Sequence, residues 1–297
     1  MAVAGQQEIA FPSPQGRNPL RAFVKFARAQ PLATFGLLAL VVFLFIAAFA
    51  PMLTPQDAYQ TSVRDALSKP GSEHWFGTDN LGRDVFSRVL LATRFSLFLG
   101  AAATVFAIAI YSVLGLVSGY VGGMIDTFLQ RLVDAAMAIP FLLFLLLVVT
   151  MLGPGFLTIA FVIGLYNGVT NSRVIRGSVL SVKREVYVEA ARSVGVPPWR
   201  IVVRHVLPNI MATIIIIASL SLGSSILAES SLSFLGYGVP PPDPTWGQMM
   251  GAEARPYVTR GPWMAIFPGI ALSIVVFSIN VLGDGLRDAL DPRLRNR

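Results

Sequence analysis

Six long runs of mostly apolar residues alternate with polar segments along this chain. A helix that spans a membrane needs about 20 predominantly apolar residues, and each run approaches that length. None shows the short alternating pattern of a membrane β-barrel strand. The pattern predicts an all-α polytopic membrane protein with six transmembrane helices, at Leu32–Pro51, Phe95–Gly119, Asp134–Leu152, Phe156–Arg173, Leu207–Leu235 and Trp263–Leu286.

The composition agrees with a membrane protein. Hydrophobic residues make up 54% of the chain and charged residues only 13%, whereas soluble domains have about 25% charged residues. A water-soluble protein of 297 residues would need more charge to cover its surface, so a cytosolic or secreted enzyme is excluded. The chain has no cysteine, which rules out disulfides, Cys-ligated zinc and thiol catalysis.

Lysine and arginine residues indicate the orientation of a multi-pass chain, because they accumulate in its cytoplasmic segments. With the N-terminus inside, most of the 23 lysines and arginines fall on the inner side. Both termini are therefore predicted to be cytoplasmic. This gives a cytoplasmic tail at 1–31, a first transmembrane helix at 32–51, an external loop at 52–94, a five-helix core at 95–286 and a cytoplasmic tail at 287–297.

An outer segment, two tryptophans and a proline each predict a local feature of the structure. Thr78–Leu91 has an apolar side and is predicted to form a capped amphipathic helix that lies on the membrane or against a partner. Trp246 and Trp263 are predicted at the outer membrane interface, where tryptophan is enriched. Pro140, inside the third apolar run, predicts a bend in that helix.

The inner loop at 181–209 has a pattern typical of two short helices joined by a glycine turn. Gly195 follows the first helix as a C-terminal cap would, and Pro198 suits the first turn of the second helix. Pro208 predicts a bend into the fifth transmembrane helix. Small and apolar residues recur at helical spacing on the first helix and form one face, which consists of Tyr187, Ala190, Ala191 and Val194.

This inner loop allows two interpretations. In the first, the small residues let the groove of another protein approach the helix closely, so the loop is a docking element. In the second, the loop is an amphipathic segment that lies on lipid headgroups. A DNA-binding helix-turn-helix is not expected, because the loop is tethered to two membrane spans, and nucleic acid is therefore not expected as a partner.

A row of polar residues follows one side of the fifth predicted span. Ionisable groups at membrane depth are candidates for function, and Glu229 is the clearest one in this chain. Residues four apart lie on the same side of a helix. The row either forms a wall of a translocation path or packs helices against one another, and it consists of Ser221, Ser225, Glu229 and Ser233.

Three segments together carry a resemblance to a transporter family. The inner loop has Glu189–Ala190–Ala191, then Gly195, then the run RHVLPN at Arg204–Asn209. The other two segments are FGTDNLGRD at Phe76–Asp84 and LAESSLSFLG at Leu227–Gly236. The chain resembles the permeases of ATP-binding-cassette (ABC) importers, in the dipeptide, oligopeptide and nickel branch, and within it the second, C-type permease subunit.

The resemblance implies a type I importer permease fold with an extra N-terminal helix before the five-helix core, in the inner membrane of a bacterial or archaeal cell. A second permease would complete the path, an external binding protein would deliver the ligand, and lipid would surround the helices. Two ATPase subunits would bind ATP and Mg²⁺ and dock on the coupling loop of this chain. The residues implied in docking are Tyr187, Glu189, Ala190, Ala191, Gly195, Pro198, Arg204, His205 and Pro208, with His205 where many members of the wider family have isoleucine.

Missing motifs agree with a subunit that performs no chemistry. The chain has no G-x-x-x-x-G-K-[ST] phosphate loop, and its two histidines, His74 and His205, lie far apart in the sequence. Neither ATPase activity nor a metal or cofactor site is expected. The alternative from another class is a stand-alone secondary transporter with Glu229 as a proton or ion site. Within the ABC family, the substrate is open among peptides, nickel, glutathione, opines and glycosides.

Overall fold

The computed structural model of this chain describes residue 27 and residues 30–290 of the 297. Most of the two predicted cytoplasmic tails lies outside the described residues. The described part is helical, and its only β structure is a single bridge between Thr78 and Asp84. The α-helices are α2 (Pro31–Leu53), α3 (Val85–Val121), α4 (Gly123–Ala138), α5 (Phe141–Leu152), α6 (Phe156–Val182), α7 (Val186–Ser193), α8 (Pro198–Ile201), α9 (Leu207–Phe234), α10 (Trp246–Gln248) and α11 (Trp263–Leu290), with shorter 3₁₀ or π turns η1 (Val63–Asp65), η2 (Val202–Val206), η3 (Met249–Glu253) and η4 (Arg255–Tyr257).

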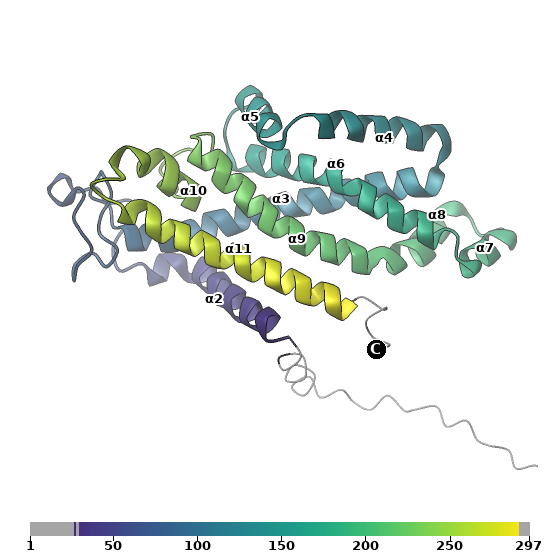
Figure 1. Cartoon of the computed structure of the whole chain (residues 1–297), viewed down its shortest axis with the longest axis horizontal. Coiled ribbons are helices and arrows are strands. Elements are labelled where there is room, and N and C mark those ends of the chain that lie inside the picture. The colour runs from purple at the N-terminus through teal and green to yellow at the C-terminus, as the bar shows by residue number, and fades with distance from the viewer. Residues whose placement is uncertain (1–26, 28–29, 291–297) are drawn as a thin grey trace, which may run out of the picture.

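The long helices run along the long axis of the molecule, with loops at one end and α7 at the other (Figure 1). Among the described residues, four stretches are long and apolar enough to cross a membrane, namely α2, α3, the α8–α9 stretch Pro198–Phe234, and α11. The pair α4–α5 makes a fifth if it counts as one bent span. The remaining predicted span is α6, whose 27 residues suffice in length, although its asparagines and arginines make it less apolar.

The third predicted span is divided into two helices. Residues Asp134–Leu152 were expected to form one helix with a bend, but α4 ends at Ala138 and α5 begins at Phe141. The two helices meet at an angle of 94°. Pro140 explains the break, because proline has no N–H for the helical ladder and its ring clashes with the preceding turn. The bend predicted from Pro140 is confirmed, and it is sharp enough to end the helix.

The outer end of α3 differs from the predicted amphipathic helix at Thr78–Leu91. The helix begins at Val85, and Asp84 caps it by accepting a hydrogen bond from the backbone N–H of Ser87 at 2.8 Å. It then continues without a break through the predicted second span to Val121. The prediction of a separate helix on the membrane is therefore wrong, because the cap lies six residues later than Thr78 and no residue ends the helix before the membrane.

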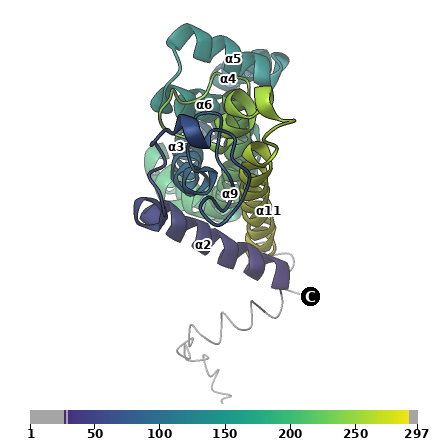
Figure 2. The ribbon, with the colours of Figure 1, turned by 90° about the vertical axis from the view of Figure 1, so that its left-hand side faces the viewer.

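The contact between α3 and α6 forms the centre of the bundle. Glycines on α6 allow the two backbones to approach closely, since a Cβ atom on Gly164 would lie 2.5 Å from Phe106 Cβ, and one on Gly168 would lie 2.6 Å from Ile110 Cβ. Small residues of this kind replace the hydrophobic driving force that helices lack inside lipid. Viewed from the loop end, α3 lies in the middle, with α6, α9 and α2 around it (Figure 2).

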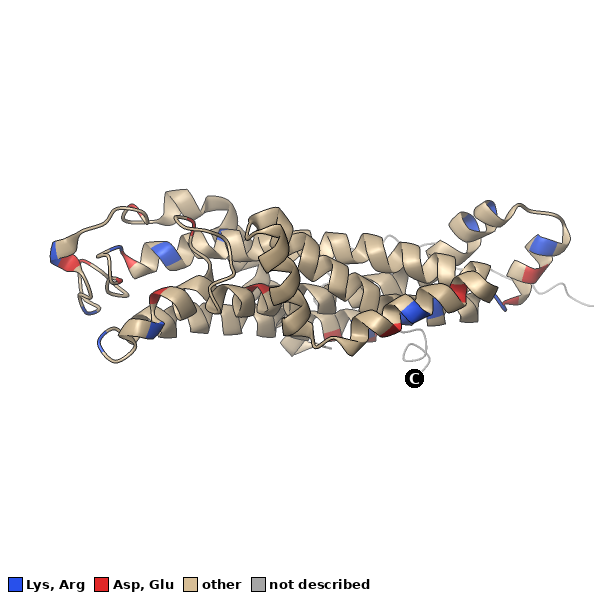
Figure 3. Ribbon diagram, turned by 90° about the horizontal axis from the view of Figure 1, so that it is seen from above, with Lys and Arg blue, Asp and Glu red and all other residues tan. Residues whose placement is uncertain are grey.

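The first and last long helices, α2 and α11, pack against each other. Gln30, before α2, donates a hydrogen bond from Nε2 to Asp288 Oδ2 near the end of α11, at 3.1 Å. Farther along the two helices, a Cβ on Gly36 would lie 2.5 Å from the Ser278 carbonyl oxygen. Charged residues gather toward the two ends of the bundle and leave a middle zone with few charges (Figure 3), as expected of a chain that crosses a membrane with both termini on the cytoplasmic side.

Close packing of α6 on α3 yields a first prediction. Gly168→Val should destabilise the protein by about 1–3 kcal/mol, the usual cost of overpacking a filled interior, because the added atoms meet Ile110. Gly177→Val on the same helix is the matched control, since no atom lies within 4 Å of its Cβ position. Thermal unfolding in detergent measures both. Equal melting temperatures for the two variants would show that the residues at the α3–α6 contact rearrange to accommodate a larger side chain.

Candidate functional site

The inner loop forms a helix that ends in a glycine turn, as the sequence predicts. Helix α7 ends at Ser193, and Gly195 has a positive φ of 78°. The N–H groups of Gly195 and Val196 bond to the carbonyls of Arg192 and Ala191, at 3.0 and 3.1 Å. These bonds satisfy carbonyls that a helix end would otherwise leave unpaired. The expectation of a left-handed glycine at position 195 is confirmed.

Helix α7 presents the predicted small-residue face to solvent and uses a different face for its own packing. Val188 is fully buried and, with Ile201 and Val206, joins the cluster of apolar residues at the inner end of the bundle. Val194 is 80% exposed and Tyr187 is 43% exposed. Ala190 is exposed as well, and Ala191 is partly buried. Three of the four residues of the predicted face are therefore exposed, whereas Ala191 packs against the inner cluster beside Val188. Val188 is the anchor that the sequence interpretation missed.

The second short helix is continuous with the fifth span. Helix α8 begins at Pro198, as predicted, and passes through the π turn η2 directly into α9, so that Pro198–Phe234 is one helical stretch of 37 residues. The helix does not end at Pro208, where the sequence predicts a bend. Proline cannot bond to the carbonyl four residues earlier, but in the π turn the N–H of Leu207 bonds to Val202, five residues earlier. This wider turn accommodates the proline without ending the helix.

Polar side chains on the loop are exposed and available. Trp199 is 64% exposed, and the Arg200 guanidinium lies 5.3 Å from its ring centroid, as in a cation–π contact. The rings of Tyr187 and His205 lie 6.3 Å apart and connect α7 to η2. Glu189, which could pair with Arg192 by its spacing, makes no ion pair with it in the described part of the chain. The remaining predicted docking residues Arg204 and Pro208 are also exposed.

The polar row on α9 is buried within the subunit. Ser221, Ser225, Glu229 and Ser233 are each at most 3% exposed. Asn167 of α6 donates a hydrogen bond from Nδ2 to Ser225 Oγ at 3.2 Å. Glu229 accepts hydrogen bonds from Ser233 at 2.7 Å and Ser230 at 3.3 Å. It is also hydrogen-bonded to the hydroxyls of Ser96 and Thr245, from α3 and the segment before α10. The row thus joins three segments of this chain, and a role as path wall stays a prediction.

A buried ion cluster at the outer end was not predicted from the sequence. Arg88 of α3 donates bidentate hydrogen bonds to Glu253 of η3 at 2.7 and 2.9 Å. Arg83 contacts the same carboxylate at 3.1 Å and Asp79 at 2.6 Å. The spacing of Asp79 and Arg83 was the available signal, because Asp79 also accepts the backbone N–H of Arg83 and so closes the turn before α3.

The outer tryptophans belong to this packed region and not to the lipid interface. Trp246 is fully buried, and its Nε1 donates to the Val89 carbonyl at 3.3 Å. Trp263 is 8% exposed and donates from Nε1 to the Thr78 carbonyl at 2.9 Å. Both lie at the outer end, as predicted, but the prediction of an interfacial position is wrong. Each ring instead fastens a loop to a helix, because its N–H needs a partner once buried.

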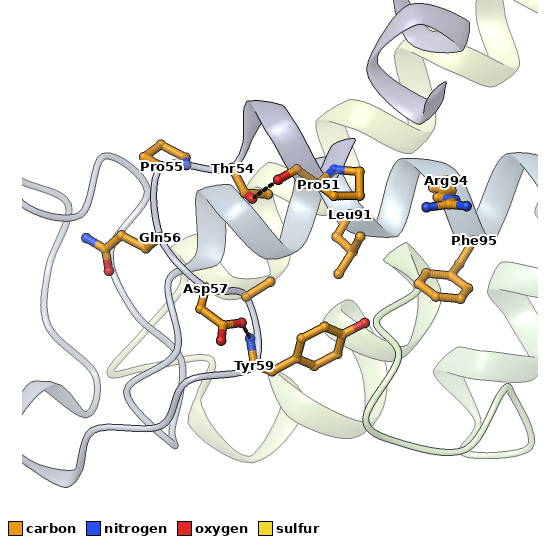
Figure 4. Close-up of a pocket in the computed structure, with 10 residues that line it drawn as sticks. Pro51, Thr54, Pro55, Gln56, Asp57, Tyr59, Leu91, Arg94 and Phe95 are labelled. Carbon is orange, nitrogen blue, oxygen red and sulfur yellow. Dashed lines mark hydrogen bonds between the residues drawn. The ribbon is translucent and has the colours of Figure 1, made fainter. Parts of the chain in front are cut away.

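The outer surface also has a cavity of about 520 Å³ between the end of α2 and the start of α3 (Figure 4). Tyr59 and Arg94 lie in its wall. The Tyr59 hydroxyl donates to Asp243 at 2.8 Å, and burial together with that hydrogen bond raises the pKa of Tyr59 to about 12. The phenol is therefore neutral at physiological pH. The end of α2 and the start of α3, whose residues line the cavity, lie at the end of the molecule opposite α7 (Figure 1).

Comparison with known protein families shows to which family the chain belongs. Residues 111–296, more than half of the chain, match the family described as "Binding-protein-dependent transport system inner membrane component". Residues 18–70 match the N-terminal transmembrane domain of oligopeptide transport permease C. The chain belongs to the binding-protein-dependent transport permeases. It is a multi-pass inner-membrane permease subunit, and the extra N-terminal helix expected from the resemblance is α2.

Known relatives of the permease are similar over nearly their full length. The dipeptide transport system permease protein DppC of Alkalihalophilus pseudofirmus is 38% identical over 94% of this chain and 91% of that protein. The glutathione transport system permease protein GsiD of Pectobacterium atrosepticum is 39% identical over 94% of this chain and 93% of that protein. The oligopeptide transport system permease protein OppC of Bacillus subtilis is 39% identical over 90% of this chain and 88% of that protein.

A solved structure supports the fold. A chain from inward-facing crystals of the MetNI methionine ABC transporter superposes with a TM-score of 0.55 and 17% sequence identity, and the match covers 66% of this permease and 93% of that chain. At that identity the similarity concerns the fold alone. It confirms the expected type I importer architecture.

The buried carboxylate yields a second prediction. Glu229→Leu should lower the free energy of unfolding by about 1–3 kcal/mol, because the Ser233 and Ser230 hydroxyls lose a buried partner. Glu229→Gln keeps an acceptor oxygen and should retain most of the stability. Ser224→Leu, at an exposed position on the same helix, controls for hydrophobicity. Thermal unfolding in detergent separates the three variants, and equal stability of the Leu and Gln variants would contradict the packing role.

Proposed function

We propose that this permease is a pore-forming subunit of an ATP-driven importer for di- or oligopeptides. The observation that supports it most strongly is the exposed small-residue helix α7, which a buried Val188 fixes at the inner end of the bundle. Two ATPase subunits would dock there and bind ATP and Mg²⁺. A second permease would complete the path, and an external binding protein would deliver the peptide. ATP hydrolysis would then take place outside this chain.

Similar relatives support a peptide-type substrate. Two of those described above are named for dipeptide and oligopeptide transport. A glutathione permease is equally similar, so glutathione is the second candidate, and it is itself a small peptide. Nickel, opines and glycosides remain alternatives within the same branch. A stand-alone secondary transporter is disfavoured, because the chain belongs to a family of binding-protein-dependent systems.

Dependence on partner subunits yields a third prediction. Purification of the tagged permease from native membranes should also recover a second permease and an ATPase subunit. Proteoliposomes that contain this chain alone should not accumulate radiolabelled dipeptide, with or without ATP, whereas the complete complex with its binding protein should. Uptake by the isolated chain would show that it works as a secondary transporter.

The turn after α7 yields a fourth prediction. Gly195→Asp should reduce the binding-protein-stimulated ATPase rate of the complex by about tenfold, equivalent to about 1.4 kcal/mol. A side chain at this left-handed position is strained and projects into the space that the ATPase would occupy, since no atom of this chain lies within 4 Å of its Cβ position.

Gly236 offers the matched control for this substitution. It also has a positive φ, of 88°, and free space around its Cβ position, but it follows α9 at the outer end. Gly236→Asp introduces the same charge and the same strain far from α7. Its stimulated ATPase rate should stay near that of the unmodified complex. If Gly195→Asp retains full stimulation and transport, α7 lies on lipid and does not dock the ATPase.

A further inference from the structure

Helix α4 is attached to the bundle with very little apolar packing. Within α4, whose residues the structure describes throughout, only Val133 is buried. Other apolar side chains of this helix point away from the subunit, with Met124 90% exposed and Phe128 64% exposed. By contrast, α3 and α6 are joined along their length by glycines and buried aliphatic residues. Apolar contact alone therefore holds α4 only weakly.

Ion pairs supply the missing attachment between α4 and α6. Asp126 near the start of α4 accepts two hydrogen bonds from Arg176 of α6, both at 2.6 Å. Two turns farther along α4, Asp134 pairs with Arg173. At the inner end, Gln130 donates from Nε2 to Ser118 Oγ of α3 at 3.0 Å. Polar bonds thus connect α4 to its neighbours along most of its length.

The Asp134–Arg173 pair lies toward the inner end of the bundle. A Cβ on Gly115 of α3 would lie 3.0 Å from the carbonyl oxygen of Ser172, the neighbour of Arg173. Gly115 is six residues before the end of α3 at Val121, roughly 9 Å along the helix. The side chains of Arg173 and Asp134 are 40% and 48% exposed. Exposed charged groups of a membrane protein face water or another protein and not lipid.

Both ends of α4 are built to change direction. Gly122 and Gly123, between α3 and α4, have positive φ values of 75° and 60°, and no atom lies within 4 Å of either Cβ position. At the other end, the break at Ile139–Pro140 separates α4 from α5 at 94°. Chain rotation at the glycines would meet no side chain, and proline removes the helical bond that would stiffen the far end.

We propose that α4 is a movable arm at the inner mouth of the path, and that the Asp134–Arg173 and Asp126–Arg176 pairs are a latch that opens during each transport cycle. The proposal rests on the proposed function, because it requires a path and a cycle. The Asp134–Arg173 pair is exposed, and exposed ion pairs contribute little to stability, so it can break and re-form without unfolding the subunit. The Asp126–Arg176 pair is less exposed, at 16% and 31%, and lies close to Gly122 and Gly123, where a rotation of α4 moves its residues least. Elements that move in transport are drawn from such weakly packed parts of a structure.

Cross-linking the latch tests the proposal directly. The chain has no cysteine, so Asp134→Cys combined with Arg173→Cys introduces the only two thiols of this subunit. In the complete complex in proteoliposomes, a short thiol-reactive cross-linker should abolish most peptide uptake, because a covalent tether between α4 and α6 prevents the arm from moving. A reducible cross-linker should allow recovery on reduction. The cross-linking yield should also differ between the nucleotide-free and the vanadate-trapped complex.

The end contact between α2 and α11 gives the matched control. Gln30→Cys with Asp288→Cys places two thiols at another hydrogen-bonded pair on the inner side, outside the proposed latch. Cross-linking there should leave uptake within twofold of the untreated complex. Full uptake by the complex with the cross-linked latch, or the same yield in both nucleotide states, would show that α4 is fixed and would overturn the proposal.

A second experiment exchanges the charges of Asp134 and Arg173. It tests the latch even if the cysteine substitutions alone alter the position of α4. Asp134→Arg and Arg173→Asp should each lower uptake about fivefold through like-charge repulsion, and the double variant should restore it. A double variant as impaired as the single variants would overturn the latch. Failure of the proposed function has a different signature, because the unmodified complex with its binding protein would then take up no peptide at all.

Discussion

The close contact between α3 and α6 is the constraint on which the rest of the permease depends. Lipid is as apolar as the side chains it would replace, so helices in a membrane associate by dense packing and not by exclusion from water. Glycines at 164 and 168 on α6, and at 115 and 119 on α3, bring the two backbones together from both sides. Helix α9 packs against this pair, and α11 and α2 extend the bundle. The inner loop and α4 are then attached at the inner ends of α6.

The charged residues form three groups that differ in the solvent exposure of their side chains, and each group has a different role. The outer cluster around Arg88 and Glu253 is buried and bonded on several sides, so breaking it would leave charges unpaired in the interior. It therefore fixes η3 to the start of α3. The charges of α7 are exposed and form no ion pair with any residue that the structure describes, as suits a surface that another protein covers. The α4–α6 pairs are intermediate, because they are bonded and yet accessible.

Hydropathy predicts most of the fold and little of the site's detail. Apolar runs located α2, α3, α6, α9 and α11, because the bilayer requires about 20 apolar residues per span. Most of α4 (Gly123–Ala138) precedes the third predicted span and was missed. The left-handed backbone of Gly195 was predictable from its position after a helical pattern. The start of α3 at Val85 was missed, since a helix that continues beyond the membrane is no longer apolar. Val188 was missed because two faces of α7 carry small or apolar residues, and only the tertiary contact with Ile201 distinguishes them. The outer ion cluster joins residues more than 160 positions apart, a pairing that no local pattern contains.

The continuity of α8, η2 and α9 connects the two ends of the molecule mechanically. A helical stretch of 37 residues is about 55 Å long at 1.5 Å per residue, enough to reach from the inner loop to the outer end of the bundle. A break at Pro208 would have allowed the inner loop to move independently of the span. In the π turn the N–H of Leu207 bonds to Val202, so the helical ladder continues past Pro208, while Val206 and Ile210 stay buried in the inner cluster. At its outer end the same helix carries Glu229, bonded to α3 and to the segment before α10. The inner loop and the outer end of the bundle thus share one continuous helix, whereas α4 is a separate helix that ion pairs join to α6.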